Sequence, residues 1–178
     1  MRTNKTMYQF IALIWLLPII FMIHDFEEII FMKSWFNKNG NYLAERFPKI
    51  GKKLVSRYNN FSTAGFALAV AEEFVLLSLI TVGSIICNSY VLWLAAFMGF
   101  FAHLLIHLVQ WIMVKRYIPA ICTTFIALIY CGYTFYIIIT NNLFHLSEIV
   151  LWGITGCVLM GVNLVLAHKL AEWFNRNF

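Results

Sequence analysis

The sequence predicts an all-α membrane protein, a bundle of five transmembrane helices with one interfacial amphipathic helix. Three observations lead to this fold class. Of the 178 residues, 62% are hydrophobic and only 12% are charged; the mean hydropathy is +0.79; and five long apolar stretches contain no Lys or Arg. Soluble domains carry about 45–50% apolar and about 25% charged residues. The composition therefore favours a chain embedded in lipid.

The five apolar stretches define the predicted spans. Crossing the hydrocarbon core takes roughly 20 mostly apolar residues in a helix. The stretches that meet this length are residues 8–32, 62–86, 89–114, 118–140 and 147–168. Since these spans follow one another with no separate soluble domain between them, we interpret residues 1–178 as a single transmembrane domain.

Residues 33–61 form the only long polar segment, between the first two spans. Phe47, Leu54 and Tyr58 recur at helical spacing with Lys residues between them, and Pro48 stands where a helix can start. Basic residues at a membrane surface gain about 1 kcal/mol each from anionic lipid. The segment is predicted to be an amphipathic interfacial helix, either a positive-inside anchor or a lid over a lipid substrate. Because topology explains the positive charge, nucleic acid is not an expected partner.

The distribution of basic residues predicts the orientation. With five spans, Arg2 and Lys5 are the only cations on the side of the amino terminus. The other side holds Lys33, Lys38, Arg46, Lys49, Lys52, Lys53, Arg57, Lys115, Arg116, Lys169 and Arg176. Cytoplasmic loops carry the excess of Lys and Arg. The amino terminus is therefore expected outside and the carboxyl terminus in the cytoplasm.

Ionisable residues inside the spans are expected to form the functional site. His24, Glu27 and Glu28 lie at positions i, i+3 and i+4, on one face of the first helix. The remaining candidates are Glu72 and Glu73 in the second span, and His103 and His107 with Gln110 on the same face of the third. At about 1.5 Å of rise per residue, all of them fall in the cytoplasmic half of the bilayer. Three helices thus bring polar faces to one depth.

Burying so many acids needs an explanation. A charge at the centre of a spanning helix costs roughly 2.5–3.5 kcal/mol, and no Lys or Arg lies within the five stretches. Protonated carboxyls, a water-filled cavity or bound metal cations would each offset this cost. The histidines favour metal, because His103 and His107 at i, i+4 can grip one ion from a single helix. An interfacial cap, in which Asp25, Glu27 and Glu28 meet water, is the alternative for the first helix.

The number of candidate ligands predicts two divalent transition-metal ions, with zinc favoured and iron or manganese as alternatives. The expected ligands from the three spans are His24, Glu27, Glu28, Glu72, Glu73, His103 and His107. Adjacent glutamates point about 100° apart on a helix, so one of Glu72 and Glu73 can bind metal while the other acts as general base or supports a ligand. Glu73 and Glu28 are the expected catalytic carboxylates, and Gln110 the expected support of a ligand.

The pattern His24-Asp25-Phe26-Glu27-Glu28 resembles the HXXEE family of bacterial integral membrane proteins. The resemblance extends over most of the chain and implies an uncharacterised protein of the bacterial plasma membrane with metal-binding residues. Two further motifs of the family would match Ala69 to Glu72 or Glu73, and Asn163 to His168. The resemblance thereby adds His168 as a ligand and Asn163 as its support. These two residues lie about 140° apart on a helix. They can therefore belong to one site only if the helix bends, or if one binds the metal directly and the other acts through a ligand. Otherwise His168 lies at the membrane interface.

The favoured function is an intramembrane metal-dependent hydrolase. In this hypothesis water activated by metal attacks an ester, amide or phosphoester of a lipid-like small molecule that arrives from the cytoplasmic leaflet, and a glutamate takes the proton. A di-iron oxidase or hydroxylase is the rival within the metalloenzymes, because His and Glu in helical bundles also build such centres. A non-enzymatic ion- or proton-handling protein and an assembly factor with protonated acids are the other hypotheses. The oligomeric state is left open.

Overall fold

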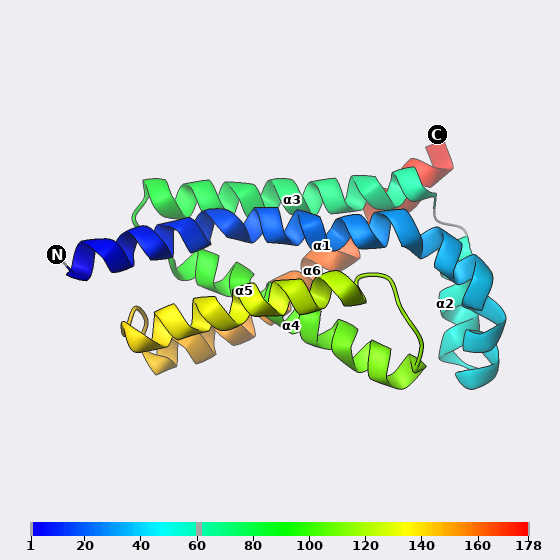
Figure 1. The fold of residues 1–178 in the computed structure, drawn as a ribbon. Coiled ribbons are helices and arrows are strands. Elements are labelled where there is room, and N and C mark those ends of the chain that lie inside the picture. Colours follow the sequence, from blue (N-terminus) through cyan, green and yellow to red (C-terminus); the bar gives the residue numbers. More distant parts are fainter. Residues whose placement is uncertain (1, 60–61, 178) are drawn as a thin grey trace.

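The protein is a bundle of long helices (Figure 1). The computed structural model describes residues 2–59 and 62–177, without the side chains of residues 2–4, 57 and 59. Within these ranges the chain forms six helices and no strand: α1 (Arg2–Arg46), α2 (Ile50–Asn59), α3 (Thr63–Ile86), α4 (Val91–Val114), α5 (Ile121–Thr140) and α6 (Leu146–Asn177). Five of these described helices, all except α2, are long and apolar enough to cross a membrane. The predicted fold class is confirmed.

The five long helices alternate in direction. Figure 1 shows the amino terminus and the α3–α4 and α5–α6 turns at one end of the bundle. The opposite end, which we call the basic end, holds α2, the loop of residues 115–120 and the end of α6. Asn88 and Asn142 have positive φ angles in the two short turns, a conformation that Asn tolerates better than most residues. The topology matches that inferred from the apolar stretches.

Helix α1 is much longer than the predicted first span. It does not end near Met32 but continues to Arg46, and its 45 residues measure about 67 Å at 1.5 Å per residue, against about 30 Å for the hydrocarbon core. The charges after Met32 mark the expected end of the apolar surface, whereas the helix continues until the chain approaches Pro48. Helix α6 likewise continues beyond His168 to Asn177.

The predicted amphipathic helix is present as α2, beginning two residues after Pro48. It packs against the last turns of α1, where the Tyr58 ring stacks on Phe36 with 4.3 Å between ring centroids. Ile50 and Leu54 remain exposed and are free to meet a membrane surface. Residues 60–61 of the predicted segment 33–61, and the side chain of Arg57, lie outside the described part.

The remaining packing leaves a polar region between α1 and α4. Helix α6 packs along α3 and α4, while α1 packs on α3 and α5 and meets α4 only over a short stretch. The main core is apolar and aromatic, with Phe10, Trp93 and Phe97 almost completely buried. Beyond this core, toward the basic end, the facing surfaces of α1 and α4 carry histidines in place of apolar residues.

The extension of α1 fixes the loop between α4 and α5. Three side chains of the extension donate hydrogen bonds to carbonyls of the last turn of α4 and of this loop: Tyr42 Oη to Val114 (2.8 Å) and Arg46 Nε to Met113 (3.0 Å) in α4, and Trp35 Nε1 to Tyr117 (2.6 Å) in the loop. The loop then turns back, and Figure 1 shows that α5 begins further inside the bundle than α4 ends. The first turn of α5 therefore lies beside α1, next to Glu27.

Candidate metal centre

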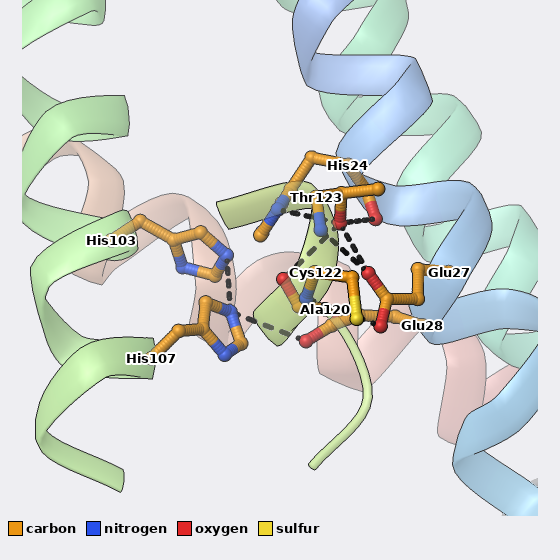
Figure 2. Close-up of polar contacts among 8 residues, drawn as sticks. All are labelled: His24, Glu27, Glu28, His103, His107, Ala120, Cys122 and Thr123. Atoms are coloured by element: carbon orange, nitrogen blue, oxygen red, sulfur yellow. Dashed lines mark hydrogen bonds and ion pairs between the residues drawn. The ribbon is translucent and has the colours of Figure 1, made fainter. Parts of the chain in front are cut away.

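Three histidines from two helices converge inside the bundle. His24 comes from α1, and His103 and His107 come from successive turns of α4. One ring nitrogen of each lies within 4.8 Å of the corresponding nitrogens of the other two, and the Nε2 atoms of His103 and His107 are 2.9 Å apart. Figure 2 shows the two α4 rings facing His24. The i, i+4 spacing in α4 thus brings both imidazoles to one point, opposite α1.

Glu28 joins the histidines one turn after His24 on α1. Its Oε1 atom lies 3.2 Å from His107 Nε2, and both side chains are buried. Figure 2 draws this contact on the side of His107 that faces α1. The expected association of His24, Glu28, His103 and His107 is therefore present, and it combines three nitrogens with one carboxylate.

Hydrogen bonding directs the lone pair of His24 toward the other histidines. The Thr123 hydroxyl donates to Glu27 Oε2 at 2.6 Å, and its oxygen lies 3.4 Å from His24 Nδ1. With the hydroxyl proton directed to Glu27, the contact suits the tautomer of His24 that carries its proton on Nδ1 and its lone pair on Nε2. Within the described chain, His24 Nε2 is buried and has no hydrogen-bond partner. This arrangement orients an imidazole as metal ligands commonly are.

Glu27 makes hydrogen bonds to α5 and to the preceding loop, which is not the role expected of a metal ligand. Its carboxylate accepts hydrogen bonds from the backbone N–H of Thr123 (2.8 Å) and of Cys122 (3.4 Å), and from the Tyr117 hydroxyl (2.7 Å). The backbone donors belong to the first turn of α5, whose N–H groups have no partner within the helix. The sequence-based expectation that Glu27 binds metal is not what the geometry shows, since Glu27 caps α5 instead.

Capping by Glu27 also explains how one acid is stabilised inside the bundle without Lys or Arg. A helix amino terminus carries a partial positive charge of roughly half an elementary charge, and α5 presents this end to Glu27 next to His24. Sequence reasoning considered protonation, water and metal as ways of stabilising the acids and missed this one. The signal was available in Pro119 and in Thr123 and Thr124, polar residues at the start of an apolar span.

A second group of acids surrounds a small cavity next to the histidines. The cavity measures about 40 Å³, and its polar lining consists of Asp25, Glu28, Glu73, His103 and His168. This volume exceeds the about 10–15 Å³ that one water requires. Glu28 and His103 belong both to this lining and to the histidine group, so the two parts form one continuous polar region. Glu73 and His168, which come from α3 and α6, are thereby brought to the site as expected.

Asp25 is a residue that sequence reasoning overlooked. It is only 3% exposed, and its Oδ2 atom is buried without a hydrogen-bond partner among the described residues. The sequence-based site left it out, yet Asp25 and Glu28 stand at i, i+3 on α1, a spacing that places both on one face. That spacing was the signal that could have identified it.

The remaining expected residues lie at the edge of the site. Glu72 accepts a hydrogen bond from Asn163 Nδ2 at 3.2 Å and does not line the cavity, so the adjacent Glu73 is the one directed to the centre. Asn163 therefore supports Glu72 and not His168. His168 donates from Nδ1 to the Leu164 carbonyl at 2.6 Å. Gln110 lies beside His107 but is exposed.

The three histidines have the spacing that one metal ion requires. Ligand atoms around tetrahedral zinc, with bonds of about 2.0–2.1 Å, stand about 3.3 Å from one another. The contacts of His107 Nε2 with His103 Nε2 and Glu28 Oε1, at 2.9 and 3.2 Å, are close to this value. Asp25, Glu28 and Glu73 line the adjacent cavity, whereas among the described residues the ligand atoms of the three histidines are the ones that all lie within 4.8 Å of one another. The geometry thus indicates one candidate metal position, at the histidines.

Comparison with known proteins identifies a family without an assigned activity. A family model described as a protein of unknown function with HXXEE motif matches residues 15–135. The matched range contains the histidine group together with Asp25, Glu28 and Glu73, whereas Asn163 and His168 lie beyond it. No curated protein and no solved structure matches the chain.

Proposed function

We propose that this chain, which belongs to the family of proteins of unknown function with an HXXEE motif, is an intramembrane metal-dependent hydrolase acting on a lipid-like substrate. One observation carries the proposal. Three histidines direct ring nitrogens to one buried point: His24, His103 and His107. In the described structure, the Nε2 atom of His24 has no hydrogen-bond partner. A buried polar atom left without a partner costs about 1–3 kcal/mol, and a metal ion would remove this cost.

The acids supply the rest of the proposed site. Glu28, which contacts His107, would hold the ion at the histidines, and Asp25, which lines the adjacent cavity with Glu28, would be available to a second ion. A metal ion in such a site polarises a carbonyl and lowers the pKa of water. Zinc is the favoured metal because neutral imidazole and carboxylate are its usual nitrogen and oxygen ligands.

Glu73 is the proposed general base, since it lies on α3, opposite the histidines, and is less buried than Glu28. In the reaction Glu73 accepts a proton from water as the water oxygen attacks the carbonyl carbon of an ester or amide. The bond to the leaving oxygen or nitrogen then breaks, and Glu73 returns the proton to that atom. The products are a carboxylic acid and an alcohol or amine, with no change in oxidation state.

A di-iron oxidase or hydroxylase is the second candidate. The observation in its favour is the group of carboxylates, because Asp25, Glu28 and Glu73 around one cavity resemble the carboxylate-rich donor sets that bind two irons inside helical bundles. Iron near two atoms per chain, with colour in air, would favour this candidate over the hydrolase.

The proposed location is the plasma membrane of a bacterium, with the amino terminus outside and the carboxyl terminus in the cytoplasm. The support is the accumulation of Lys and Arg at the basic end, including Lys115 and Arg116 in the loop after α4. A reporter fused to the carboxyl terminus is expected to be active only as a cytoplasmic reporter. Activity of a periplasmic reporter at the same position would contradict the orientation.

The first test is the metal content of the purified protein. Protein purified in detergent without added metal is measured by elemental mass spectrometry, beside His103→Ala and His107→Ala. His145→Ala is the matched control, because His145 is exposed in the α5–α6 turn, away from the site. Stoichiometric metal in wild type and control, lost in the two variants, is the expected result. Absence of metal in every sample, also after reconstitution with zinc, iron or manganese, would overturn the proposal.

A further inference from the structure

An apolar groove extends from the proposed centre along the outside of the bundle. It lies between α3, α4 and α6 and has a volume of about 340 Å³, within the about 300–1,000 Å³ of typical ligand sites. Its polar lining is confined to Glu73, His103 and Asn163, and the rest is apolar. Glu73 and His103 also line the small cavity of the centre. The groove therefore ends at the proposed reacting groups.

The groove is long and narrow and leads away from the basic end. On α4 its lining extends from His103 back to Leu92, which is about 16 Å at 1.5 Å per residue. On α3 it extends from Glu73 to Ile80, about 10 Å by the same measure. Both segments lie inside helices long enough to span the bilayer. The groove therefore lies within the membrane-spanning helices.

Small residues at the crossing of α4 and α6 form the floor of the groove. Ala95, Gly99 and Gly156 line it, and the two helices approach so closely here that a Cβ added to Gly156 would overlap the Ala95 carbonyl oxygen. The walls are higher, and Leu76, Leu92 and Leu159 at their rims are about half exposed. The groove is therefore open along one side to the surrounding lipid.

We propose that this groove binds the single long hydrocarbon chain of the substrate, with the polar group of the chain held at Glu73 and His103. A hydrocarbon chain is the occupant that fits, because an apolar furrow inside a bilayer has lipid chains as neighbours and not water. The one polar end fits a molecule with a single polar head, such as a fatty acyl ester or amide. The reactive assignment rests on the proposed function, whereas chain binding does not.

The groove defines both a path and a length for the substrate. Access is lateral, from the bilayer past Leu76 and Leu159, so the substrate need not leave the membrane. The groove extends about 16 Å from His103 along α4. The enzyme is therefore expected to select acyl chains in which the distance from the carbonyl carbon to the methyl end matches this length.

Photolabelling with fatty acids tests this proposal. The probes are two palmitic acid analogues, one with a diazirine near the methyl end and one with a diazirine near the carboxyl group, added to protein in phosphatidylcholine vesicles. The first is expected to label residues around Leu92, Ala96 and Ile80, and the second residues around His103 and Glu73. Excess unlabelled palmitate is expected to suppress both.

Ala96→Leu supplies the variant and Ala102→Leu its control. Ala96 lines the groove on α4, whereas Ala102 is on the same helix and does not. Filling the groove at Ala96 is expected to reduce methyl-end labelling several-fold, with no change for Ala102→Leu. Labelling that spreads evenly over lipid-facing residues of α5, or that is equal in the two variants, would overturn the proposal.

His107→Ala separates this proposal from the metal-dependent function, because His107 does not line the groove. Methyl-end labelling is expected to persist in this variant even though its metal is expected to be lost. Persistent labelling in a protein that never binds metal would reject the hydrolase and retain the chain-binding groove. Metal binding without specific labelling would reject the groove alone.

Discussion

Glu27 and Glu28 are adjacent in sequence and have different structural roles. Glu27 accepts the backbone N–H groups that begin α5, whereas Glu28 contacts His107 and lines the small cavity. Adjacent residues point about 100° apart on a helix, which is enough to direct one toward α5 and the other toward α4. The two can therefore be tested separately by the same isosteric change.

Glu27→Gln is expected to destabilise the fold and leave metal binding in place. The amide keeps an acceptor oxygen but loses the charge that strengthens bonds to Tyr117 and Thr123, so we expect a loss of about 1–3 kcal/mol. Glu28→Gln is expected to abolish stoichiometric metal with a smaller effect on stability. Thermal unfolding and elemental analysis of both variants measure this difference. A Glu27→Gln protein that keeps full stability but loses its metal would reverse our assignment.

Thr123→Val is expected to weaken metal binding through His24. The valine methyl replaces the hydroxyl that His24 Nδ1 contacts, so the tautomer and orientation of the ring are no longer fixed. Loss of a residue that hydrogen-bonds to a metal ligand typically lowers metal affinity about 10–100-fold, and we expect a loss of this size here. Thr123→Ser keeps the hydroxyl and serves as the control in zinc titrations. Equal affinities of the two variants would show that the contact has no role.

The environment of Tyr117 predicts that the fold loses stability at high pH. Tyr117 lies in the loop outside the spanning helices, where burial and then its hydrogen bond to Glu27 raise the pKa of the phenol above its ordinary value. Because the pKa is higher in the folded state, the protonated phenol contributes its full stabilisation below the unfolded pKa of about 10. This contribution declines as the pH rises above that value. Tyr117→Phe is expected to lose less stability than wild type between about pH 9 and 11. Parallel denaturation curves for the two proteins would contradict this.

Among the elements, α1 and α5 differ most from what the apolar stretches indicate. The extension of α1 beyond Met32 and the recessed start of α5 depend on each other, because Trp35 and Tyr42 hold the connection that leads into α5. Hydropathy reports which residues suit hydrocarbon, and so it located the spans. It carries no information on where a helix continues in water or on which carboxylate meets a helix end 96 residues away.

Gly51→Ala is expected to separate α2 from α1. A Cβ at this position would overlap the Leu43 carbonyl, and a backbone atom cannot turn aside as a side chain can. Limited digestion with trypsin is expected to cleave after the exposed Lys49, between the two helices, several-fold faster than in wild type. Lys52→Ala, at an exposed neighbouring position of α2, is expected to leave the rate unchanged. Equal cleavage rates would show that the close packing is not needed.

At the scale of the whole molecule, the sequence was sufficient for the topology and for most of the site. His24, Glu28, Glu73, His103 and His107 meet as expected because helical spacing places each on a definite face and all fall at a similar depth. The sequence could not separate Glu27 from Glu28, since which of two adjacent side chains faces α4 depends on the rotation of α1 in the bundle. That rotation is set by packing.

Metal removal is expected to lower the stability of the entire bundle. A ligand that binds only the folded state stabilises it by RT ln(1 + [L]/Kd), about 2.7 kcal/mol at a concentration 100 times Kd. Chelation is therefore expected to lower the melting temperature of wild type, and zinc to restore it. His107→Ala is expected to melt at one temperature with or without zinc. A wild-type protein insensitive to both treatments would contradict a metal that links α1 to α4.

The contacts of α1 also dictate an order of biosynthesis. Its buried acids find their partners on helices made later, and the Glu27–Thr123 bond joins residues 96 positions apart. Because synthesis proceeds from the amino terminus, α1 reaches the bilayer with its acids unmatched, at a cost of roughly 2.5–3.5 kcal/mol for each charge at the centre. Helix α1 is therefore inserted well before its partners exist, and its acids stay unmatched in lipid until α5 has emerged from the ribosome.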